Sequence, residues 1–229
     1  MKPVNKILVF DVETSGLLPK DVKMTTHTIN EYPHILQFSY LLYDIKKNKI
    51  IKKSDNYIDV DSTVHISPKI TELTGITREK CKKGIKILNA LKDFYDLYSQ
   101  SDVIVSHNVN FDRTMVLAEL CRNHNHITNT MPYVFTLFNK TYMERAEMST
   151  YCTMKNGIEM CNIMVESKTK PGEKYKKWPQ LIELYEYLFQ YRPENLHNSY
   201  IDSLVCLRCY LKMAKNMDNS EFDKLIPRT

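Results

Sequence analysis

The stretch that decides the fold is Ile7-Leu-Val-Phe-Asp-Val-Glu-Thr-Ser-Gly16, or ILVFDVETSG in one-letter code. Its four leading apolar residues have the character of a buried β-strand, and they run directly into Asp11 and Glu13. Residues i and i+2 of a strand point to the same face of the sheet, so these two carboxylates lie side by side. Their like charges repel unless a metal ion, a basic side chain or water separates them, and the rest of the sequence has to decide which of these it is.

Length and composition predict a single globular domain. The 229 residues, 43% hydrophobic and 26% charged, fit one large domain better than two small ones. The net charge of +5 permits a polyanionic partner without requiring one. No apolar run reaches the roughly 18 residues of a membrane span, and the N-terminal apolar stretch is too short for a signal peptide. We therefore expect a soluble intracellular protein, cytoplasmic or nuclear, with no membrane partner.

The six cysteines lack regular spacing, which indicates free thiols in a reducing compartment. Cys206 and Cys209 have the spacing of half a zinc site, for which Cys152 and Cys161 are conceivable partners. The pair falls inside a helically periodic segment, where residues three apart share one face. Packing is therefore the favoured interpretation, and structural zinc is the alternative.

The order of the expected elements predicts one α/β domain with a mixed sheet. Alternating or continuous apolar runs predict strands at 6–12, 34–45, 49–60 and 102–106. Helical spacing and caps predict helices at 67–75, 84–99, about 109–123, 178–190 and 200–215.

The remaining segments carry little periodicity. The domain is expected to span 1–215, followed by a polar tail at 216–229 that frays. The segment 18–34 is a polar stretch, 125–150 is expected to be irregular, and 168–177 is expected to be a charged Pro-Gly loop.

Two further acidic residues stand at the starts of expected helices. Asp112 closes the run SHNVNFD, and Asp202 closes HNSYID, with His197 five residues before it. Each has an ordinary explanation, because acidic residues complement the helix dipole and a lone histidine is more often a loop residue. Together with the first pair they make four carboxylates, a hard oxygen cage that suits Mg²⁺ or Mn²⁺ rather than zinc.

A cage of this kind suits phosphodiester chemistry. Two such ions about 3.5–4 Å apart clamp the attacking and leaving oxygens of a phosphodiester. A histidine that titrates near neutrality, here His197, would take the proton from the attacking water.

The three ordered motifs resemble those of the DEDDh exonucleases, the DnaQ-like 3′→5′ exonucleases with a ribonuclease H-like fold. The first motif stands here as VFDVETSGL, the second as SHNVNFD and the third as HNSYID. The likeness covers about residues 6–213, because ISPKITELTGIT resembles the family's segment between the first two motifs and YCTM its fifth strand. The tyrosine subfamily has Tyr where this chain has Asn198, so His197 indicates the histidine subfamily. One departure is Ser199, where the family usually has alanine.

The resemblance implies a central mixed five-stranded sheet flanked by helices, with two Mg²⁺ or Mn²⁺ ions and His197 as the general base. Asp11 would bridge both ions, Glu13 and Asp202 would hold the ion that bears the nucleophilic water, and Asp112 would complete the other. Six residues match motif positions beside the 3′-terminal nucleotide: Thr14, Gly16, Leu17, His107, Asn108 and Phe111. Phe111 is equally consistent with a core position.

The expected function is the metal-dependent release of nucleoside 5′-monophosphates from the 3′ end of single-stranded nucleic acid, with DNA favoured over RNA. The alternative is a catalytically inactive nucleic-acid-binding or polymerase-associated module on the same fold. All five motif residues are present, which favours the enzyme. No signature identifies a polymerase partner or a homo-oligomer, or separates proofreading from DNA repair or RNA processing.

The segment 168–177 holds five lysines opposed only by Glu173, and Tyr175 and Trp178 are potential stacking partners. The ordinary interpretation is a solvated loop. The functional interpretation is that Lys174, Lys176 and Lys177 contact the phosphates of a bound strand.

Overall fold

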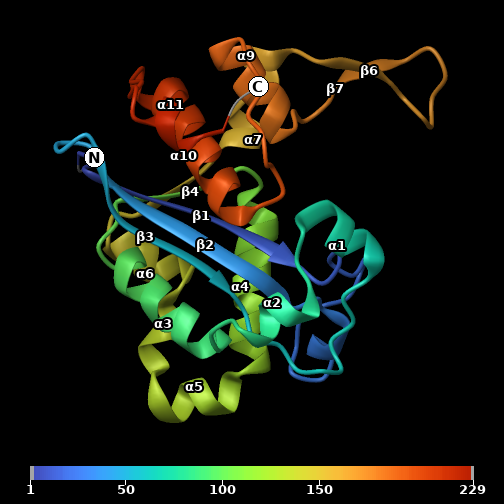
Figure 1. Ribbon diagram of the computed structural model, residues 1–229, viewed down its shortest axis with the longest axis vertical. Helices are drawn as coiled ribbons and strands as arrows, with labels where there is room; N and C mark the ends of the chain where they lie inside the picture. Colours follow the sequence, from blue (N-terminus) through green and yellow to red (C-terminus); the bar gives the residue numbers. More distant parts are fainter. Residues whose placement is uncertain (1–2, 228–229) are drawn as a thin grey trace.

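A computed structural model describes residues 3–227 and shows a five-stranded sheet with helices on both faces (Figure 1). The strand order is β3-β2-β1-β4-β5. β1 pairs antiparallel with β2 and β2 with β3, whereas β1–β4 and β4–β5 are parallel, so the predicted mixed five-stranded sheet is confirmed. The strands are β1 (Lys6–Thr14), β2 (Ile35–Asp44), β3 (Lys49–Tyr57), β4 (Val103–Ser106) and β5 (Ser149–Cys152).

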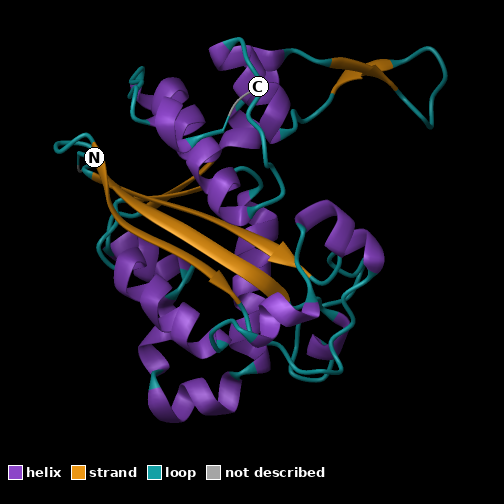
Figure 2. Cartoon of the chain, in the orientation of Figure 1, coloured by secondary structure: helices purple, strands orange, loops and turns teal. Residues whose placement is uncertain are grey.

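Helices connect and cover these strands, and Figure 2 shows how they surround the sheet. The longer ones are α3 (Ile87–Tyr98), α4 (Val109–Arg122), α9 (Leu181–Phe189) and α10 (Ser199–Lys215). The shorter α-helices are α1 (Pro68–Thr74), α2 (Arg78–Lys82), α5 (His124–Thr130), α6 (Lys140–Arg145), α7 (Thr153–Asn156), α8 (Ile158–Cys161) and α11 (Phe222–Leu225). Two 3₁₀ helices are η1 (Ile29–Glu31) and η2 (Pro132–Thr136).

The alternation of side chains along β1 divides the core into two layers. Leu8 and Phe10 belong to the layer that contains the buried residues of α3 and α4. Ile7 and Val9 belong to the layer formed with α9 and α10. Continuing the same alternation, Asp11 and Glu13 lie on the α10 side of the sheet. The buried position of α10 therefore brings a helix against the two carboxylates of the opening motif.

Caps and turns define the short helix α1 as the sequence predicts. The Ser67 side chain accepts a hydrogen bond from the Ile70 N–H, and Pro68 occupies the first turn. Gly75 ends the helix with φ 67°, a left-handed conformation that favours glycine.

Two of the segments expected to be irregular are instead folded. Residues 125–150 contain most of α5, with η2 and α6, and bury Ile127 and Val134 completely. The weak periodicity of this segment reflects helices too short to show a repeated apolar stripe. The segment expected as a loop at 168–177 forms part of a hairpin of β6 (Met164–Glu166) and β7 (Lys174–Lys176), which projects from the body in Figure 1. The expectation of a loop is therefore wrong for β7.

The segment 18–34 is anchored to α4. Ile29 and Tyr32 are buried against Ala118 of that helix. The Arg122 guanidinium donates to the backbone carbonyls of this segment, including that of Tyr32 at 2.9 Å. Side-chain contacts to a distant helix, rather than local periodicity, order this segment.

The expectation of a frayed tail is wrong for residues 216–227. Phe222 and Ile226 are 2% and 1% exposed and pack in the α10 layer. The buried guanidinium of Arg208 forms ion pairs with Asp218 (2.9 Å) and Asp223 (3.0 Å). Buried apolar residues and two acids dock this segment, because a buried arginine requires partners.

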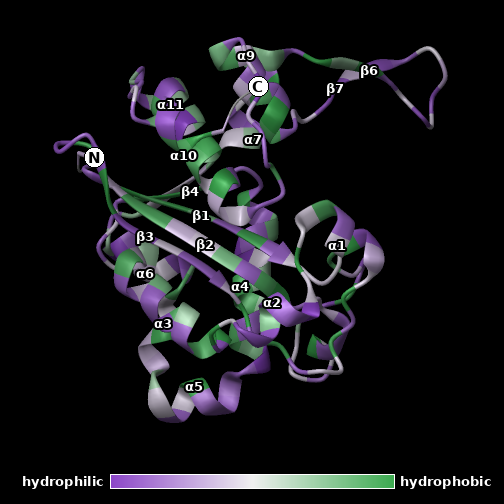
Figure 3. Ribbon diagram, in the orientation of Figure 1, coloured by the Kyte–Doolittle hydropathy of each residue, from purple (hydrophilic) through white to green (hydrophobic). Residues whose placement is uncertain are grey.

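The apolar residues follow the two core layers, whereas the outer part of the β6–β7 hairpin is mainly hydrophilic (Figure 3). Cys206 and Cys209 are buried in α10 with free thiols, as packing predicts. Within residues 3–227, the set of metal-ligating side chains that lies close enough together to share an ion contains no cysteine. No helix in the part of the chain that the structure describes has the length and apolar character needed to cross a bilayer.

Candidate active site

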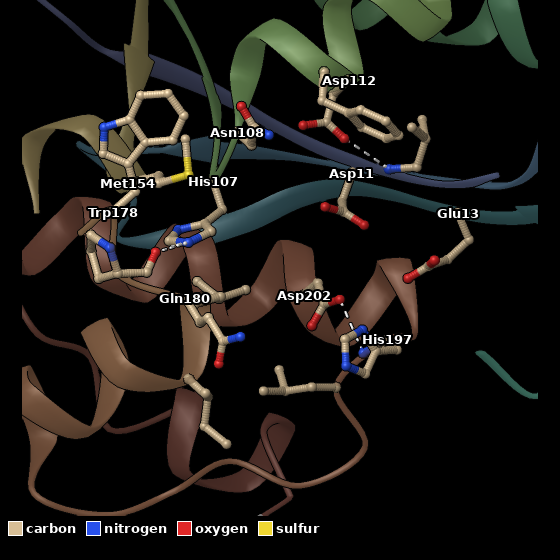
Figure 4. A pocket seen from close by; sticks show the side chains of 16 residues that line it. Asp11, Glu13, His107, Asn108, Asp112, Met154, Trp178, Gln180, His197 and Asp202 are labelled. Carbon is tan, nitrogen blue, oxygen red and sulfur yellow. Dashed lines mark hydrogen bonds between the residues drawn. The ribbon is translucent and has the colours of Figure 1, made fainter. Parts of the chain in front are cut away.

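Four carboxylates from three separate parts of the chain meet beside one cavity of about 580 Å³ (Figure 4). Asp11 and Glu13 come from β1, Asp112 from the first turn of α4 and Asp202 from the first turn of α10. In Figure 4, Asp11 and Asp202 point toward each other across the site. His197, in the loop before α10, lies at the same end of the cavity as Glu13 and Asp202.

Asp112 is held by both neighbouring strands. Its side chain is almost fully buried, and Oδ1 accepts a hydrogen bond from the Val12 N–H at 3.3 Å. Its second oxygen, Oδ2, accepts a hydrogen bond from the Ser106 hydroxyl at the end of β4. These bonds join the start of α4 to β1 and β4, so the position of this carboxylate is defined by the sheet itself.

Asp202 is held on one side only. Its Oδ2 accepts a hydrogen bond from the His197 N–H at 3.1 Å, while its buried Oδ1 has no hydrogen-bond partner in the described structure. A buried carboxylate oxygen without a donor is costly in a folded protein. The unpartnered atom faces the same site as the other carboxylates, where a cation would satisfy it.

His197 adopts an uncommon backbone conformation next to that carboxylate, with φ 67°. The Asn198 side chain caps α10 by accepting hydrogen bonds from the N–H groups of Tyr200 (3.1 Å) and Ile201 (3.3 Å). The Asn198 cap and the hydrogen bond from the His197 N–H to Asp202 together fix the backbone of the loop at His197. The imidazole itself is solvent-exposed, and a nitrogen from it lies within 4.8 Å of carboxylate oxygens of Glu13 and Asp202.

Burial raises the pKa of all four acids, and neighbouring carboxylates add to the rise for Asp11, Glu13 and Asp202. Burial, followed by the charges of its three acidic neighbours, raises the pKa of Asp11 well above its ordinary value. Burial raises the pKa of Glu13 to about 8, with further contributions from Asp202 and Asp112. Burial also raises the pKa values of Asp112 and Asp202 to about 7, although hydrogen bonds to their oxygens act in the opposite direction.

The residues of this site fit a hard divalent cation. Among residues 3–227, none of the four carboxylates forms an ion pair with lysine or arginine, so no basic side chain separates the charges. Oxygen donors, uncompensated negative charge and the unpartnered Oδ1 of Asp202 together match the preferences of Mg²⁺ or Mn²⁺. Of the explanations left open for the opening pair, a metal ion is the one that this arrangement supports.

The metal-free protein is expected to lose stability as the pH rises from about 4 to about 8. A carboxyl whose pKa is higher in the folded than in the unfolded chain binds more protons when folded, so raising the pH through this window disfavours folding. Divalent cations should reverse the trend, because they bind the deprotonated form. Thermal unfolding in EDTA and in MnCl₂ at pH 5 and pH 8 tests this. An Mn²⁺-induced rise in Tm that is no larger at pH 8 than at pH 5 would contradict it.

A polar network anchors the start of α10 to the sheet. The Ser199 hydroxyl lies 2.6 Å from the Ser39 hydroxyl, and the Ser199 N–H donates to Gln37 Oε1 at 3.4 Å. Ser39 Oγ and Gln37 Nε2 both donate to Asp55 Oδ1 at 2.8 Å. Since a carboxylate accepts only, Ser39 must donate to Asp55 and Ser199 must donate to Ser39.

This network lies directly beside the carboxylates. Ser39 is the cross-strand partner of Asp11, and Gln37 is the partner of Glu13. Ser199 stands where the DEDDh exonucleases usually have alanine. Its hydroxyl joins α10 to this polar network. The strand register therefore couples the β1 carboxylates to the helix that carries Asp202.

His107 faces a different part of the cavity from the carboxylates. Its Nδ1 lies 3.0 Å from Thr153 Oγ1 and its Nε2 lies 3.0 Å from the Pro179 carbonyl. Burial lowers the pKa of His107 to about 4, so the ring is neutral. Because a carbonyl only accepts, Nε2 carries the proton and Nδ1 accepts from Thr153. Both ring nitrogens form hydrogen bonds within the protein, so His107 lines the cavity but has no free nitrogen to offer a ligand.

The other predicted substrate-contact residues divide into two groups. Asn108 and Phe111 line the cavity, and Phe111 also packs against the core beneath α4, so both interpretations of that residue apply. Thr14, Gly16 and Leu17 do not line it. The Thr14 hydroxyl donates to the Gly16 carbonyl at 2.7 Å, and Leu17 is 87% exposed beyond the end of β1.

Sequence reasoning named Trp178 as a potential stacking partner but missed the rest of one wall of the cavity. This wall consists of Met154 after β5, the segment 178–182 and Leu196. The only signal in the sequence is that Trp178 and Pro179 follow the lysine-rich segment directly. Their place in the site depends on the bond from His107 to the Pro179 carbonyl, which joins residues 72 positions apart.

The sheet order, the two helical layers and the carboxylates beside one cavity match the fold of ribonuclease H-like exonucleases. The family model described as Exonuclease, of the RNase T type, matches residues 8–159. The chain belongs to this exonuclease family.

Curated relatives and solved structures agree with this assignment. The DNA polymerase III PolC-type protein of Streptococcus agalactiae serotype III (strain NEM316) is 33% identical over 130 residues, 57% of this chain and 8% of that protein. Among solved structures, E. coli exonuclease I in complex with a dA16 oligonucleotide has a TM-score of 0.60 at 17% identity, over 96% of this chain and 43% of that one. The nuclease domain of 3′hExo, a DEDDh family member bound to rAMP, has a TM-score of 0.59 at 14% identity over 93% of each chain.

Proposed function

We propose that this protein removes nucleoside 5′-monophosphates stepwise from the 3′ end of single-stranded nucleic acid, with DNA preferred over RNA. The observation that carries this proposal is the convergence of four buried or half-buried carboxylates, unpaired by any basic side chain among the described residues, with His197 at their edge. Two Mg²⁺ or Mn²⁺ ions held by these carboxylates would activate the attacking water and offset charge on the phosphate.

The protein's own groups would divide the work of binding and proton transfer. Asp11, central among the acids, would contact both cations, with Asp112 on one side and Glu13 and Asp202 on the other. Asp112 would hold its position through Ser106 and Val12, whereas Asp202 would offer the oxygen that has no other partner. The neutral His107 and Asn108 would line the part of the cavity that receives the strand.

His197 would act as the general base. Its exposed ring can exchange protons with solvent, and its main-chain N–H is bound to Asp202. A neutral imidazole nitrogen would take the proton of the attacking water and release it to bulk solvent between turnovers. The polar network at Ser199 would support this role by holding the first turn of α10 against β2.

Similar proteins include one that binds DNA and one that recognises RNA. E. coli exonuclease I was crystallised with DNA oligonucleotides, whereas another neighbour is a 3′-exonuclease that recognises a histone mRNA stem-loop. The relatives that are closer in sequence are DNA polymerases, which favours DNA and a role in proofreading or repair. Six free thiols favour a reducing intracellular compartment, nuclear or cytoplasmic.

An inactive binding or polymerase-associated module on the same fold is the competing function. Such a module has no need for four acids with raised pKa values around one cavity, because their mutual repulsion is a cost without a cation. The retained cluster therefore favours catalysis.

A 5′-labelled single strand incubated with Mg²⁺ or Mn²⁺ is expected to yield a ladder that shortens from its 3′ end. EDTA should abolish the reaction, because the carboxylates would then lack their cations. Single-stranded DNA, duplex DNA and RNA of one sequence should be offered side by side, with single-stranded DNA cleaved fastest. The label appearing at once as mononucleotide, or cleavage that survives EDTA, would contradict the proposal.

The lysines of the hairpin would contact the phosphates of the strand outside the cavity. Lys174 is exposed on β7, whereas Lys176 forms an ion pair with Glu159, and Lys177 with Glu183 at 2.5 Å. The pair between Lys176 and Glu159 is exposed, and exposed ion pairs are weak, so a phosphate can replace the carboxylate partner of Lys176.

Replacing Lys174, Lys176 and Lys177 together with alanine is expected to weaken binding similarly for all sequences. The slope of log affinity against log salt should flatten by up to about 2, since each phosphate contact to a single strand contributes about 0.7. Binding should be measured with calcium in place of magnesium to prevent hydrolysis. A matched triple variant uses exposed lysines of other elements and should leave the slope unchanged: Lys82, Lys92 and Lys140. An equal slope in both triple variants would make the hairpin lysines a solubility feature only.

A further inference from the structure

Trp178 is the only tryptophan of the chain, and its side chain is solvent-exposed at the edge of the site. It lies between the end of β7 and the start of α9, lines the same cavity as the carboxylates and is 59% exposed. An indole is the largest apolar side chain, and its position outside the core leaves a flat aromatic face in contact with water. Figure 4 shows it beside His107 and Met154, across the cavity from His197.

The backbone on the C-terminal side of Trp178 is held firmly. The buried Pro179 directly after it accepts a hydrogen bond from His107 Nε2 at 3.0 Å. Gln180 then starts α9 with a capping box, in which its N–H donates to Glu183 Oε2 at 2.7 Å.

The backbone on the N-terminal side of Trp178 is held as well. The Lys177 N–H donates to the Ile163 carbonyl at 3.0 Å, which continues the ladder of the hairpin. The Lys177 ammonium also pairs with Glu183 of α9. The indole therefore projects from a fixed point, and its exposure does not follow from a loose loop.

The surroundings of Trp178 indicate what its open face would contact. Inside the cavity, the carboxylates would bind a phosphodiester through their cations. On the outer side, the chain continues as the β6–β7 hairpin, where Lys174 and the 52% exposed Tyr175 supply positive charge and a second aromatic ring. A polymer that passes from the cavity to the hairpin must carry negative charge and flat apolar groups at short intervals. An unpaired polynucleotide strand has both.

We propose that Trp178 is a stacking platform for a nucleobase of the bound strand, and that it selects strands whose bases are unpaired. This inference rests on the proposed nuclease function and adds the residue by which the site would select unpaired bases. A base in a duplex stacks on its own neighbours and offers no free face to the indole. Stacking on an aromatic side chain tolerates any sequence, because every base has a π-face.

Substituting Trp178 is expected to weaken binding of a single strand while the fold is retained. Loss of one base–aromatic stack corresponds to about 5- to 150-fold in Kd for Trp178→Ala, with Trp178→Phe retaining most of the affinity. The matched control is Tyr187→Ala, which removes a 49% exposed ring of α9 that does not line the cavity and should leave Kd unchanged.

The single tryptophan provides a direct readout of the contact. Full-length protein with calcium in place of magnesium should be titrated with a dT12 oligonucleotide, and quenching of the intrinsic fluorescence should follow binding. Oligonucleotides that carry one abasic site, moved stepwise from the 3′ end, should include one position where the quenching is lost. At that position alone, Trp178→Ala should cause no further loss of affinity, because the stacked base is already absent.

Different results would contradict the stacking role of Trp178 and the proposed nuclease function. If wild-type protein hydrolyses the strand but Trp178→Ala has an unchanged Kd, or weakens intact and abasic strands equally at every position, the stacking role is wrong and the nuclease function stands. If no oligonucleotide is hydrolysed with Mg²⁺ or Mn²⁺, and dT12 neither binds nor quenches, the proposed function itself is wrong.

Discussion

Replacing Asp11 with asparagine is expected to abolish hydrolysis and, at the same time, to stabilise the metal-free protein at pH 8. The amide cannot offset the charge of the cations, and losing several kcal/mol of their contribution corresponds to a rate loss of about 10³-fold or more. In the absence of metal, the same change removes the free-energy cost of a carboxyl whose pKa is raised by burial and by its three acidic neighbours, so that folding at pH 8 opposes its ionisation.

Two measurements separate these effects from simple unfolding. Titration with Mn²⁺ should show weaker binding by Asp11→Asn, while the Tm in EDTA at pH 8 should rise. The control Asp93→Asn changes an exposed acid of α3 and should alter neither activity nor metal affinity. Unchanged Mn²⁺ affinity in Asp11→Asn would rule out this residue as a ligand, and a lower Tm in EDTA would mean that the carboxylate stabilises the fold through contacts of its own.

His197→Ala is expected to reduce the rate by about 10² to 10⁴-fold, the contribution of a positioned general base. The His197 nitrogen also lies close enough to Glu13 and Asp202 to be a metal ligand, which gives a second explanation for any loss of activity. Metal affinity separates the two roles. A base can be removed with the cations still bound, whereas loss of a ligand weakens their binding.

Chemical rescue gives an independent test of the same residue. Imidazole added to the His197→Ala variant should restore part of the rate, because the ring is exposed and the vacated space opens to solvent. The matched control is His65→Ala, an exposed histidine outside the cavity, with an expected rate equal to wild type. Near-full activity of His197→Ala at pH 7 would exclude the histidine as base, and weakened Mn²⁺ binding with no rescue would assign it as a ligand.

The core of the fold was predictable because local pattern and tertiary structure agree along β1. The continuous apolar run from Ile7 to Phe10 predicts the buried strand, and the two-residue period of a strand predicts the shared face of the two acids. The structure places α10 over that face. The short helix α1 likewise follows from Ser67, Pro68 and Gly75, whose caps act within a few residues.

The sequence was less informative where order depends on distant partners. β7 is a three-residue strand of Lys, Tyr and Lys, which has no apolar alternation and exists only through pairing with β6. The tail docks because Arg208 of α10 finds Asp218 and Asp223, a relation that no local pattern contains.

The site shows the same division between local and distant determinants. The four acids and His197 belong to recognisable motifs, but the direction of a side chain within a motif is set by its partners. His107 belongs to the second motif, yet its ring is bound by Thr153 and Pro179. The hydrogen bond from Ser39 to Asp55 depends on the register of β2 and β3, which no single segment specifies.

Because Asp202 and His197 lie at the start of α10, the proposed activity would depend on a late-synthesised part of the chain. A nascent chain that has emerged as far as β5 can build the layer formed by α3 and α4, but it leaves Ile7 and Val9 of β1 without the helix that covers them. At that stage it holds Asp11, Glu13 and Asp112 without the last carboxylate or the base. On the proposed function, phosphodiester cleavage would begin only when the last long helix docks, and an incomplete chain would not cleave nucleic acid.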